Sequence, residues 1–311
     1  MKNTERPYRY TKAGYIPSEA INPYKESKSD RLVVKGARAK NLLHAIEISI
    51  LLILVIFMVA LGFSAKAETT DAWLDEGYQT WSPELVKRIQ TALNNYLSKT
   101  VGGYQPIKVD GIFGADTGTY VMMFQAKKGL EVDGICGKNT LSAMGIMDTG
   151  EHPRYIADRR KVFSRSSNGH AVYIPLLKGS DYEAYYYERT TDGWKLVKTL
   201  KIAVGDFEDG TPTPFAAGVL TGEGNHGYIH DSKDTWRGYN ATYFKHVPGR
   251  GKFFFHSILK LNKGGEWRWQ GDSVLGTACS HGCIRLGVDD SEWHKNFATA
   301  GTVVVIDARK N

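Results

Sequence analysis

The chain has 311 residues, of which 42% are hydrophobic and 23% are charged, and these ordinary globular values exclude wholesale disorder and a fibrous repeat. A formal net charge of +7 results from 40 Lys and Arg residues against 33 Asp and Glu residues. Six of these seven charges lie in residues 1–43. The remainder of the chain is nearly neutral, which predicts that the protein has no nucleic-acid partner.

A membrane segment is the first predicted element. Residues 48–63 read ISILLILVIFMVALGF and contain no charged side chain. With its apolar neighbours this run reaches about 20 residues, the length that crosses a bilayer. Basic residues concentrated before such a segment keep the N-terminus in the cytoplasm. We therefore expect a single-pass protein with a disordered cytoplasmic basic arm (1–43), a transmembrane signal anchor (44–65), a linker (66–79) and extracytoplasmic residues 68–311.

Cleavage after Ala67 is an open alternative, because Ala65-Lys66-Ala67 has the small residues of a signal-peptidase site. A charged arm of more than 40 residues is far longer than the charged region of an ordinary signal peptide. We therefore predict an uncleaved anchor.

Residues 80–147 predict a small bundle of three helices. Ser82-Pro83-Glu84 has the N-cap residue, the proline and the acidic side chain with which helices begin. Apolar residues then follow at intervals of four and three along one helical face: Leu85, Ile89, Leu93 and Tyr96. Further helices are expected at 116–128 and 139–145, each directly after a glycine-rich turn.

Those two turns are copies of one motif. Residues 109–117 read VDGIFGADT, and residues 132–140 read VDGICGKNT. An EF-hand calcium loop needs several spaced oxygen ligands and a closing Glu, which both copies lack, so we interpret Asp110 and Asp133 as turn residues. The order of the motif residues resembles the peptidoglycan-binding type 1 domain. The resemblance implies a three-helix fold and non-covalent binding of cell-wall peptidoglycan over 80–147.

A mostly-β domain is predicted over 155–311, where the apolar pattern changes to a period of two and Gly and Asp turns separate the runs. Only 290–300 is expected to be helical. Strands are predicted at 171–175, 185–189, 196–204, 253–256 and 303–306. The predicted fold class is therefore multidomain, with a single transmembrane helix, a small three-helix bundle and a mostly-β domain.

Residues able to do covalent chemistry concentrate at 279–286, which read CSHGCIRL. A cysteine nucleophile needs a base or a positive neighbour, because the pKa of a free thiol is about 8.5. It also needs backbone N–H groups that hold the oxyanion of a tetrahedral intermediate, and Gly282 allows a tight turn that exposes them. A further histidine, His256, ends an apolar strand upstream.

The string SHGCIRL, with a strand that ends in His256-Ser257 and with GTPTP at 210–214, resembles the YkuD-type L,D-transpeptidases. The resemblance covers about 170–310. It implies that Cys283 is the acylated nucleophile, that His256 is the general base, and that the backbone carbonyl of Ser257 orients the imidazole. Three further residues complete the signature: His281, Gly282 and Arg285.

Substrate contacts are expected from Arg285, which would shape the site or meet a substrate carboxylate. The family has its substrate-capping lid where residues 221–250 lie, and the resemblance implies a lid tyrosine, Tyr239 or Tyr243. The stretch between the base and the nucleophile is long for the family. We expect its polar, Trp-containing insert, 263–269, to extend the lid.

The resemblance implies ping-pong acyl transfer without a metal or an organic cofactor. Cys283 attacks the carbonyl of the L-centre before a terminal D-Ala in a tetrapeptide stem. The side-chain amine of a second stem then attacks the thioester and forms a 3→3 cross-link, whereas attack by water would make the enzyme an L,D-carboxypeptidase. The expected partners are peptidoglycan stem peptides and glycan, the membrane through one helix, and carbapenems as covalent inhibitors, with residues 68–311 facing the cell wall.

Two further alternatives stay open. The first is a zinc site formed by Cys279, His281, Cys283 and His256, although the spacing Cys-x-His-x-Cys does not match the usual ligand spacings. The second is a non-catalytic wall anchor, in which loss of the nucleophile or the base would be expected. Cys279 either pairs with Cys136 or is free.

Overall fold

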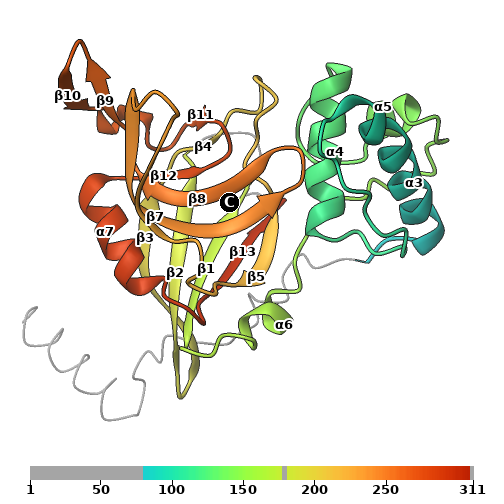
Figure 1. The fold of residues 1–311 in the computed structure, drawn as a ribbon. Coiled ribbons are helices and arrows are strands. Elements are labelled where there is room, and N and C mark those ends of the chain that lie inside the picture. Colours follow the sequence, from blue (N-terminus) through green and yellow to red (C-terminus); the bar gives the residue numbers. More distant parts are fainter. Residues whose placement is uncertain (1–79, 177–180, 309–311) are drawn as a thin grey trace, which may run out of the picture. The chain divides into compact units, whose positions relative to one another are not determined.

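The computed structural model describes residues 80–176 and 181–308 (Figure 1). The predicted basic arm, membrane segment and linker lie outside these residues. Within the two described ranges, no helix has both the length and the apolar character needed to cross a bilayer. All of the described residues belong to the same compact unit.

The predicted three-helix bundle is confirmed. Its helices are α3 (Pro83–Thr100), α4 (Ala115–Lys128) and α5 (Lys138–Ala143). Ser82 is the N-cap residue of α3, and Pro83 lies in its first turn. Leu85, Ile89 and Leu93 are buried because intervals of four residues bring them to one face of the helix.

A buried glutamine closes each copy of the sequence repeat. Nε2 of Gln90 faces three acceptors: Asp110 Oδ1 at 3.0 Å, the carbonyl of Ile112 at 3.0 Å and Thr117 Oγ1 at 3.3 Å. Asp110 also accepts from the backbone N–H of Ile112 at 2.9 Å, which makes it a turn residue, as interpreted from the sequence. The second copy repeats the arrangement with Gln125, Asp133, Ile135 and Thr140.

A five-stranded sheet forms one side of the β domain. Its strands are β1 (His170–Pro175), β2 (Glu183–Thr190), β3 (Gly193–Lys201), β5 (Ala216–Val219) and β13 (Val303–Asp307). They follow the order β3-β2-β1-β13-β5, in which β1 and β13 are parallel and the other neighbours are antiparallel. The first and last strands of the predicted β domain are thus paired at its centre.

The strand predicted at 196–204 ends earlier than expected. β3 stops at Lys201, and β4 (Val204–Gly205) is a separate strand that pairs with β11 (Ala278–Ser280). Between β3 and β4 the chain changes its hydrogen-bonding partner. The N–H of Ile202 donates to the carbonyl of Tyr182, and Ala203 exchanges hydrogen bonds with Arg285. A continuous run of apolar and polar residues carries no signal for such a change.

The second sheet contains the strand that ends in His256. Its strands are β6 (His226–His230), β7 (Trp236–Val247), β8 (Gly251–Ser257), β9 (Lys260–Lys263), β10 (Glu266–Trp269) and β12 (Ile284–Leu286). The order is β10-β9-β7-β8-β12, and β6 pairs with β7. Helix α7 (Val288–Phe297) packs against β7 and β8 (Figure 1).

The prediction of a single helix within 155–311 is incomplete. Besides α7, this range contains α6 (Arg159–Phe163) and the short 3₁₀ helix η1 (Asp272–Val274). Both are too short to show an apolar period. Helix α6 begins at a side-chain cap, because Asp158 Oδ1 accepts from the N–H of Lys161 at 2.9 Å.

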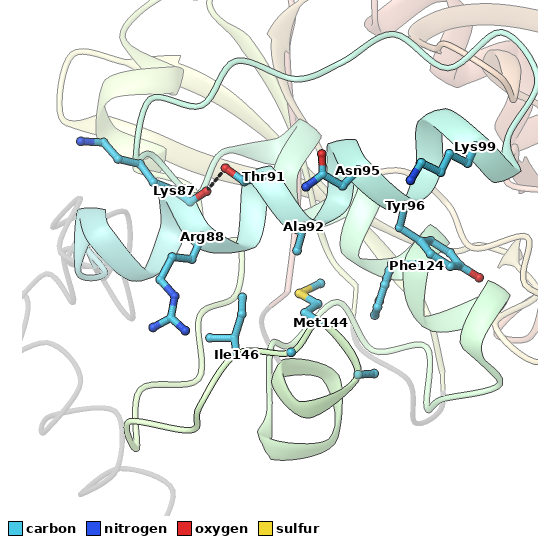
Figure 2. A pocket seen from close by; sticks show the side chains of 12 residues that line it. Lys87, Arg88, Thr91, Ala92, Asn95, Tyr96, Lys99, Phe124, Met144 and Ile146 are labelled. Atoms are coloured by element: carbon cyan, nitrogen blue, oxygen red, sulfur yellow. Dashed lines mark hydrogen bonds between the residues drawn. The ribbon is translucent and has the colours of Figure 1, made fainter.

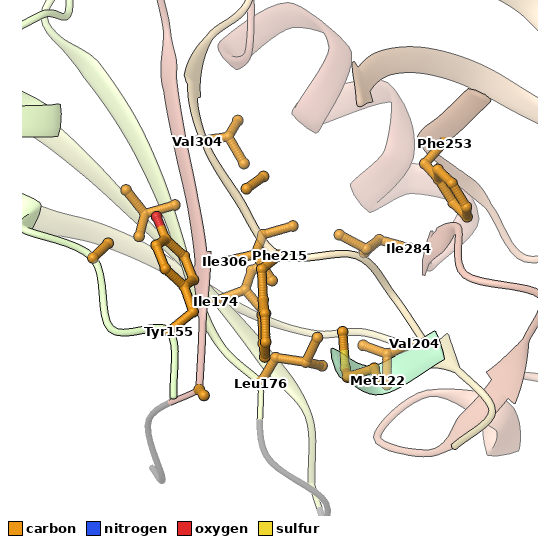
Figure 3. Close-up of a cluster of buried hydrophobic side chains, with 14 of the residues drawn as sticks. Met122, Tyr155, Ile174, Leu176, Val204, Phe215, Phe253, Ile284, Val304 and Ile306 are labelled. Atoms are coloured by element: carbon orange, nitrogen blue, oxygen red, sulfur yellow. The ribbon is translucent and has the colours of Figure 1, made fainter. Parts of the chain in front are cut away.

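The helical bundle and the β domain share one hydrophobic core. Phe215 is fully buried where they meet, and its ring centroid lies 5.6 Å from that of Tyr155 (Figure 3). Two glycines make room for the Phe215 ring. A Cβ added at Gly118 would lie 2.7 Å from the ring, and a Cβ added at Gly134 would lie 2.9 Å from it. The N–H of Phe215 also donates to Thr119 Oγ1 on α4 at 3.1 Å. The bundle is therefore packed firmly against the β domain.

Candidate active site

Two neighbouring strands bring His256 and Cys283 together. Strands β8 and β12 are parallel, and their register pairs Arg285 with His256. Cys283 directly precedes β12, and its sulfur accepts a hydrogen bond from the backbone N–H of Phe254 on β8. Because side chains alternate between the two faces of a sheet, Cys283, Arg285 and His256 lie on the same face.

The imidazole of His256 is buried, and its tautomer is fixed. Nδ1 lies 2.6 Å from the carbonyl oxygen of Ser257, which is the contact expected from the sequence. A carbonyl only accepts, so Nδ1 carries the proton and Nε2 presents a lone pair. The pKa of His256 is lowered to about 4, chiefly by burial; the Ser257 carbonyl opposes this shift and the charge of Arg285 adds to it. The ring is therefore neutral at pH 7.

Gly238 on β7 leaves room for that imidazole. A Cβ at this position would lie 2.3 Å from Nδ1 of His256 and 2.9 Å from Cε1 and Cγ. The next residue, Tyr239, donates its backbone N–H to Ser257 Oγ at 2.9 Å, and this hydroxyl donates to the carbonyl of Ile258 at 2.7 Å. Gly238 stands in no sequence motif, so only the pairing of the strands reveals it.

The turn before Cys283 is held by Ser280. Ser280 Oγ donates to the carbonyl of Cys283 at 2.5 Å and accepts from the N–H of Gly282 at 3.0 Å. Gly282 has φ of +114°, and a Cβ there would lie 2.4 Å from the ring of Phe253. The position therefore requires glycine. Its N–H is already bonded, so the oxyanion donors expected from this turn do not include it in this conformation.

The GTPTP segment at 210–214 is hydrogen-bonded to the same turn. Thr211 Oγ1 donates to the carbonyl of Ser280 at 3.2 Å, and Thr213 Oγ1 accepts from the N–H of Gly205 at 2.8 Å. A Cβ at Gly205 would lie 2.2 Å from the carbonyl oxygen of Thr211. This part of the sequence signature thus serves the structure of the loop that carries Cys283.

The thiol of Cys283 is mostly buried, and burial raises its pKa. The N–H of Phe254 and the positive charges of Arg285 and Arg250 oppose that shift. A protonated thiol and a neutral imidazole therefore share the site at rest. This combination suits transfer of the thiol proton to the base during attack rather than a permanent ion pair.

Arg285 lies below the surface of the site. It is 7% exposed, its Nη1 donates to Gln270 Oε1 at 3.3 Å, and the same nitrogen lies 3.9 Å from Cys279 Sγ. Burial lowers its pKa, and the two neighbouring cysteines oppose that shift. Its guanidinium is thus a buried positive charge beside the reacting groups, and contact with a substrate carboxylate stays a prediction.

The sequence left open a zinc site and a disulfide. Within the described residues no group of three or more His, Cys, Asp or Glu side chains is placed to hold a metal ion. All three cysteines of the chain lie in the described part and are free, so the alternative pairing of Cys279 with Cys136 is absent. Cys136 is buried inside the helical bundle. His281 is exposed at the turn before Cys283.

The expected lid region, 221–250, contains the β6–β7 hairpin. The ring of Tyr239 packs 5.7 Å from that of Tyr228 and 5.5 Å from that of Trp269, while the ring of Tyr243 packs 5.8 Å from that of Phe254. The insert belongs to the β9–β10 hairpin, which pairs with β7 and extends the same sheet. Contact of Tyr239 or Tyr243 with substrate stays a prediction.

A separate groove of about 610 Å³ lies on the helical bundle (Figure 2). Helix α3 lines it with Lys87, Arg88 and Lys99, and residues that follow α5 add the apolar side chains of Met144 and Ile146. A groove that combines cations with an apolar wall suits a ligand that combines carboxylates with apolar groups.

Two family models match the chain. Residues 82–144 match the putative peptidoglycan binding domain, and residues 178–306 match the L,D-transpeptidase catalytic domain. No curated protein is detectably similar to the chain. The two domain types expected from the sequence motifs are thus both confirmed.

Solved structures that match the chain include two L,D-transpeptidases. That of Stackebrandtia nassauensis is 18% identical, with 74% of this chain and 94% of that chain covered and a TM-score of 0.29. That of Xylanimonas cellulosilytica is 21% identical, with 74% and 97% covered and a TM-score of 0.27. A fused Zn-dependent amidase/peptidase/peptidoglycan-binding domain-containing protein of Clostridium acetobutylicum is 26% identical, with 73% and 96% covered and a TM-score of 0.30. The assignment of the two domains rests on the family models alone.

Proposed function

We propose that this chain, a cell-wall enzyme with an L,D-transpeptidase catalytic domain, forms 3→3 cross-links in peptidoglycan with Cys283 as nucleophile and His256 as general base. One observation carries the proposal: His256 on β8 and Cys283, directly before the adjoining strand β12, lie on one face, and Nε2 of a neutral imidazole is available to accept a proton. Ser257 is a positioning residue, because its carbonyl fixes the tautomer of His256.

Acylation begins when Nε2 of His256 takes the thiol proton of Cys283. The sulfur attacks the carbonyl carbon of the L-centre that precedes a terminal D-Ala, and the carbonyl electrons move to oxygen. When the tetrahedral intermediate collapses, its C–N bond breaks and the imidazolium gives its proton to the departing amine of D-Ala. A thioester on Cys283 remains.

The second half-reaction decides the product. The side-chain amine of another stem attacks the thioester carbonyl, loses a proton to His256 and forms the cross-link as the thiol leaves. If water attacks instead, the product is a shortened stem and the enzyme acts as an L,D-carboxypeptidase. Carbapenems acylate Cys283 in our proposal, because opening of a lactam ring by a thiolate yields the same kind of acyl-enzyme.

We assign contacts with the stem peptide to His281 and Gly282 at the turn, to Arg285 on β12, and to Tyr239 or Tyr243 in the lid. The groove on the helical bundle binds peptidoglycan, since its cations complement the carboxylates of stem peptides. A membrane anchor at 44–65 would hold both domains on the wall side of the cell membrane. The apolar run and the preceding basic arm support that topology.

Product analysis with the full chain and a disaccharide–tetrapeptide tests the catalytic proposal. We expect cross-linked dimers and free D-Ala from the native enzyme, and neither product from Cys283→Ala. Cys279→Ala removes a nearby thiol and should retain activity. Dimers from Cys283→Ala would overturn the assignment of the nucleophile, and D-Ala without dimers would favour the carboxypeptidase. A carbapenem should add its mass to the peptide that contains Cys283.

Sedimentation with insoluble cell walls tests the groove. Lys87→Glu with Arg88→Glu should weaken binding severalfold and leave carbapenem acylation of Cys283 unchanged. A matched control with the same change of charge is Arg165→Glu with Lys195→Glu, because both side chains are exposed on the β domain. Equal loss of binding in the two double variants would show that the groove has no specific role.

A further inference from the structure

Arg250 approaches the nucleophile from a part of the chain outside the sequence signature. It lies in the turn between β7 and β8, where its backbone N–H donates to the carbonyl of Val247 at 2.9 Å. Its Nη2 donates to the carbonyl of Pro212 at 2.8 Å, and its guanidinium carbon lies 4.9 Å from the ring centroid of Phe253. The side chain is therefore fixed at both ends.

The guanidinium of Arg250 packs against the residue before Cys283. A Cβ at Gly282 would lie 3.0 Å from Nη2 of Arg250. Because Gly282 has no side chain, nothing separates the guanidinium from the backbone that leads into the nucleophile. The glycine thus serves two purposes, since it permits a φ of +114° and admits a cation.

The guanidinium of Arg250 has an unused hydrogen-bond donor. Nη1 of Arg250 is buried and has no hydrogen-bond partner among the described residues. Burial lowers the pKa of Arg250 to about 10, so the group is still charged at pH 7, and the charge of Cys283 opposes the shift. A buried guanidinium with an open N–H is costly unless negative charge appears beside it.

The turn that carries Arg250 is also held by the helical bundle. A Cβ at Gly249 would lie 2.6 Å from Cγ1 of Val101 and 2.9 Å from the carbonyl oxygen of Gly102, which follow α3. The turn is thus packed between the bundle and the loop of Cys283. Arg250 has little freedom to swing into solvent.

We propose that Arg250 is a second cation of the catalytic centre, whose guanidinium, held against Gly282, stabilises the negative charge on the sulfur of Cys283 when its proton moves to His256. The inference rests on the proposed role of Cys283. It explains how a mostly buried thiol forms a thiolate beside a base of low pKa. Arg285 supplies positive charge from β12, and Arg250 supplies it from the opposite end of β8.

The pH dependence of Cys283 alkylation tests this role in the full chain. The rate of iodoacetamide addition to Cys283 is followed by tandem mass spectrometry, which distinguishes this adduct from one on Cys279 of the same peptide. Arg250→Gln should move the profile up by about one pH unit and slow alkylation at pH 7 about tenfold. Arg250→Lys, which keeps the charge, should restore most of the rate. A merely structural role would not move the profile in this charge-dependent way.

Lys252→Gln is the matched control, because this exposed residue of β8 carries the same charge. Its profile should equal that of the native enzyme. An unshifted profile in Arg250→Gln, or equal shifts in the Gln and Lys variants, would overturn the proposal. Either result would leave the catalytic role of Cys283 intact, because that role is tested by Cys283→Ala.

Discussion

Gly238→Ala is a small change that should disable His256, the proposed catalytic base. The added Cβ would lie 2.3 Å from Nδ1 of His256, whereas ordinary van der Waals contact begins at 3.4 Å. The ring or strand β7 must therefore move by about 1 Å, and a displacement of that size at a reacting group costs about 100-fold in rate. The 2.6 Å contact between Nδ1 and the Ser257 carbonyl would be lost with it.

Carbapenem acylation of Cys283, followed by mass spectrometry at several times, measures this effect. A hundredfold slower reaction corresponds to about 2.7 kcal/mol of transition-state stabilisation. Gly227→Ala is the control, because a Cβ at Gly227 on β6 would have no atom within 4 Å. Circular dichroism and the Tm show whether each variant is folded. A folded Gly238→Ala enzyme that reacts within twofold of the native rate would refute the reasoning.

Two predictions concern stability. Phe215→Ala empties the space between the bundle and the β domain and should lower the free energy of unfolding in denaturant by about 3–5 kcal/mol. Leu196 is 46% exposed, so the control Leu196→Ala should lower it by under about 1 kcal/mol. Similar losses in the two variants would contradict a shared core. The pKa of His256 is about 4 in the fold, against about 6.5 in the unfolded chain, so the unfolded state binds more protons between these values. His256 should therefore lower the free energy of unfolding by about 3 kcal/mol as the pH decreases from 6.5 to 4, and buried His294, with a pKa of about 3, should add a loss of similar size. His256→Gln should remove about half of this dependence, and an unchanged slope would exclude a contribution from His256.

The helical bundle shows how much local sequence can predict. The proline start of α3, its apolar face and the two Asp turns are all properties of nearby residues, and each is confirmed. The contacts of Gln90 and Gln125 were not predicted, because each glutamine lies on the helix before the turn to which it is hydrogen-bonded. A polar residue on a helix gives no sign of which loop it will meet.

The β domain shows the limit of the same reasoning. Strands that are nearly continuous apolar runs, such as β1 and β13, were predictable, but their direct parallel pairing across the whole domain was not. The end of the strand predicted at 196–204 depends on a partner, Arg285, that lies far along the chain. Alternation reports which face a side chain occupies and leaves the identity of the neighbouring strand open.

The sequence by itself determined the two domain types: SHGCIRL with His256-Ser257 predicted the L,D-transpeptidase catalytic domain, and the repeat predicted the peptidoglycan-binding bundle. Only the tertiary structure decided which other groups surround the sulfur and the imidazole. Gly238 makes room for the imidazole of His256 and Arg250 lies beside Gly282, because strand pairing and one turn bring them there. Such contacts join residues that share no local pattern, so they exist only once the sheet has formed.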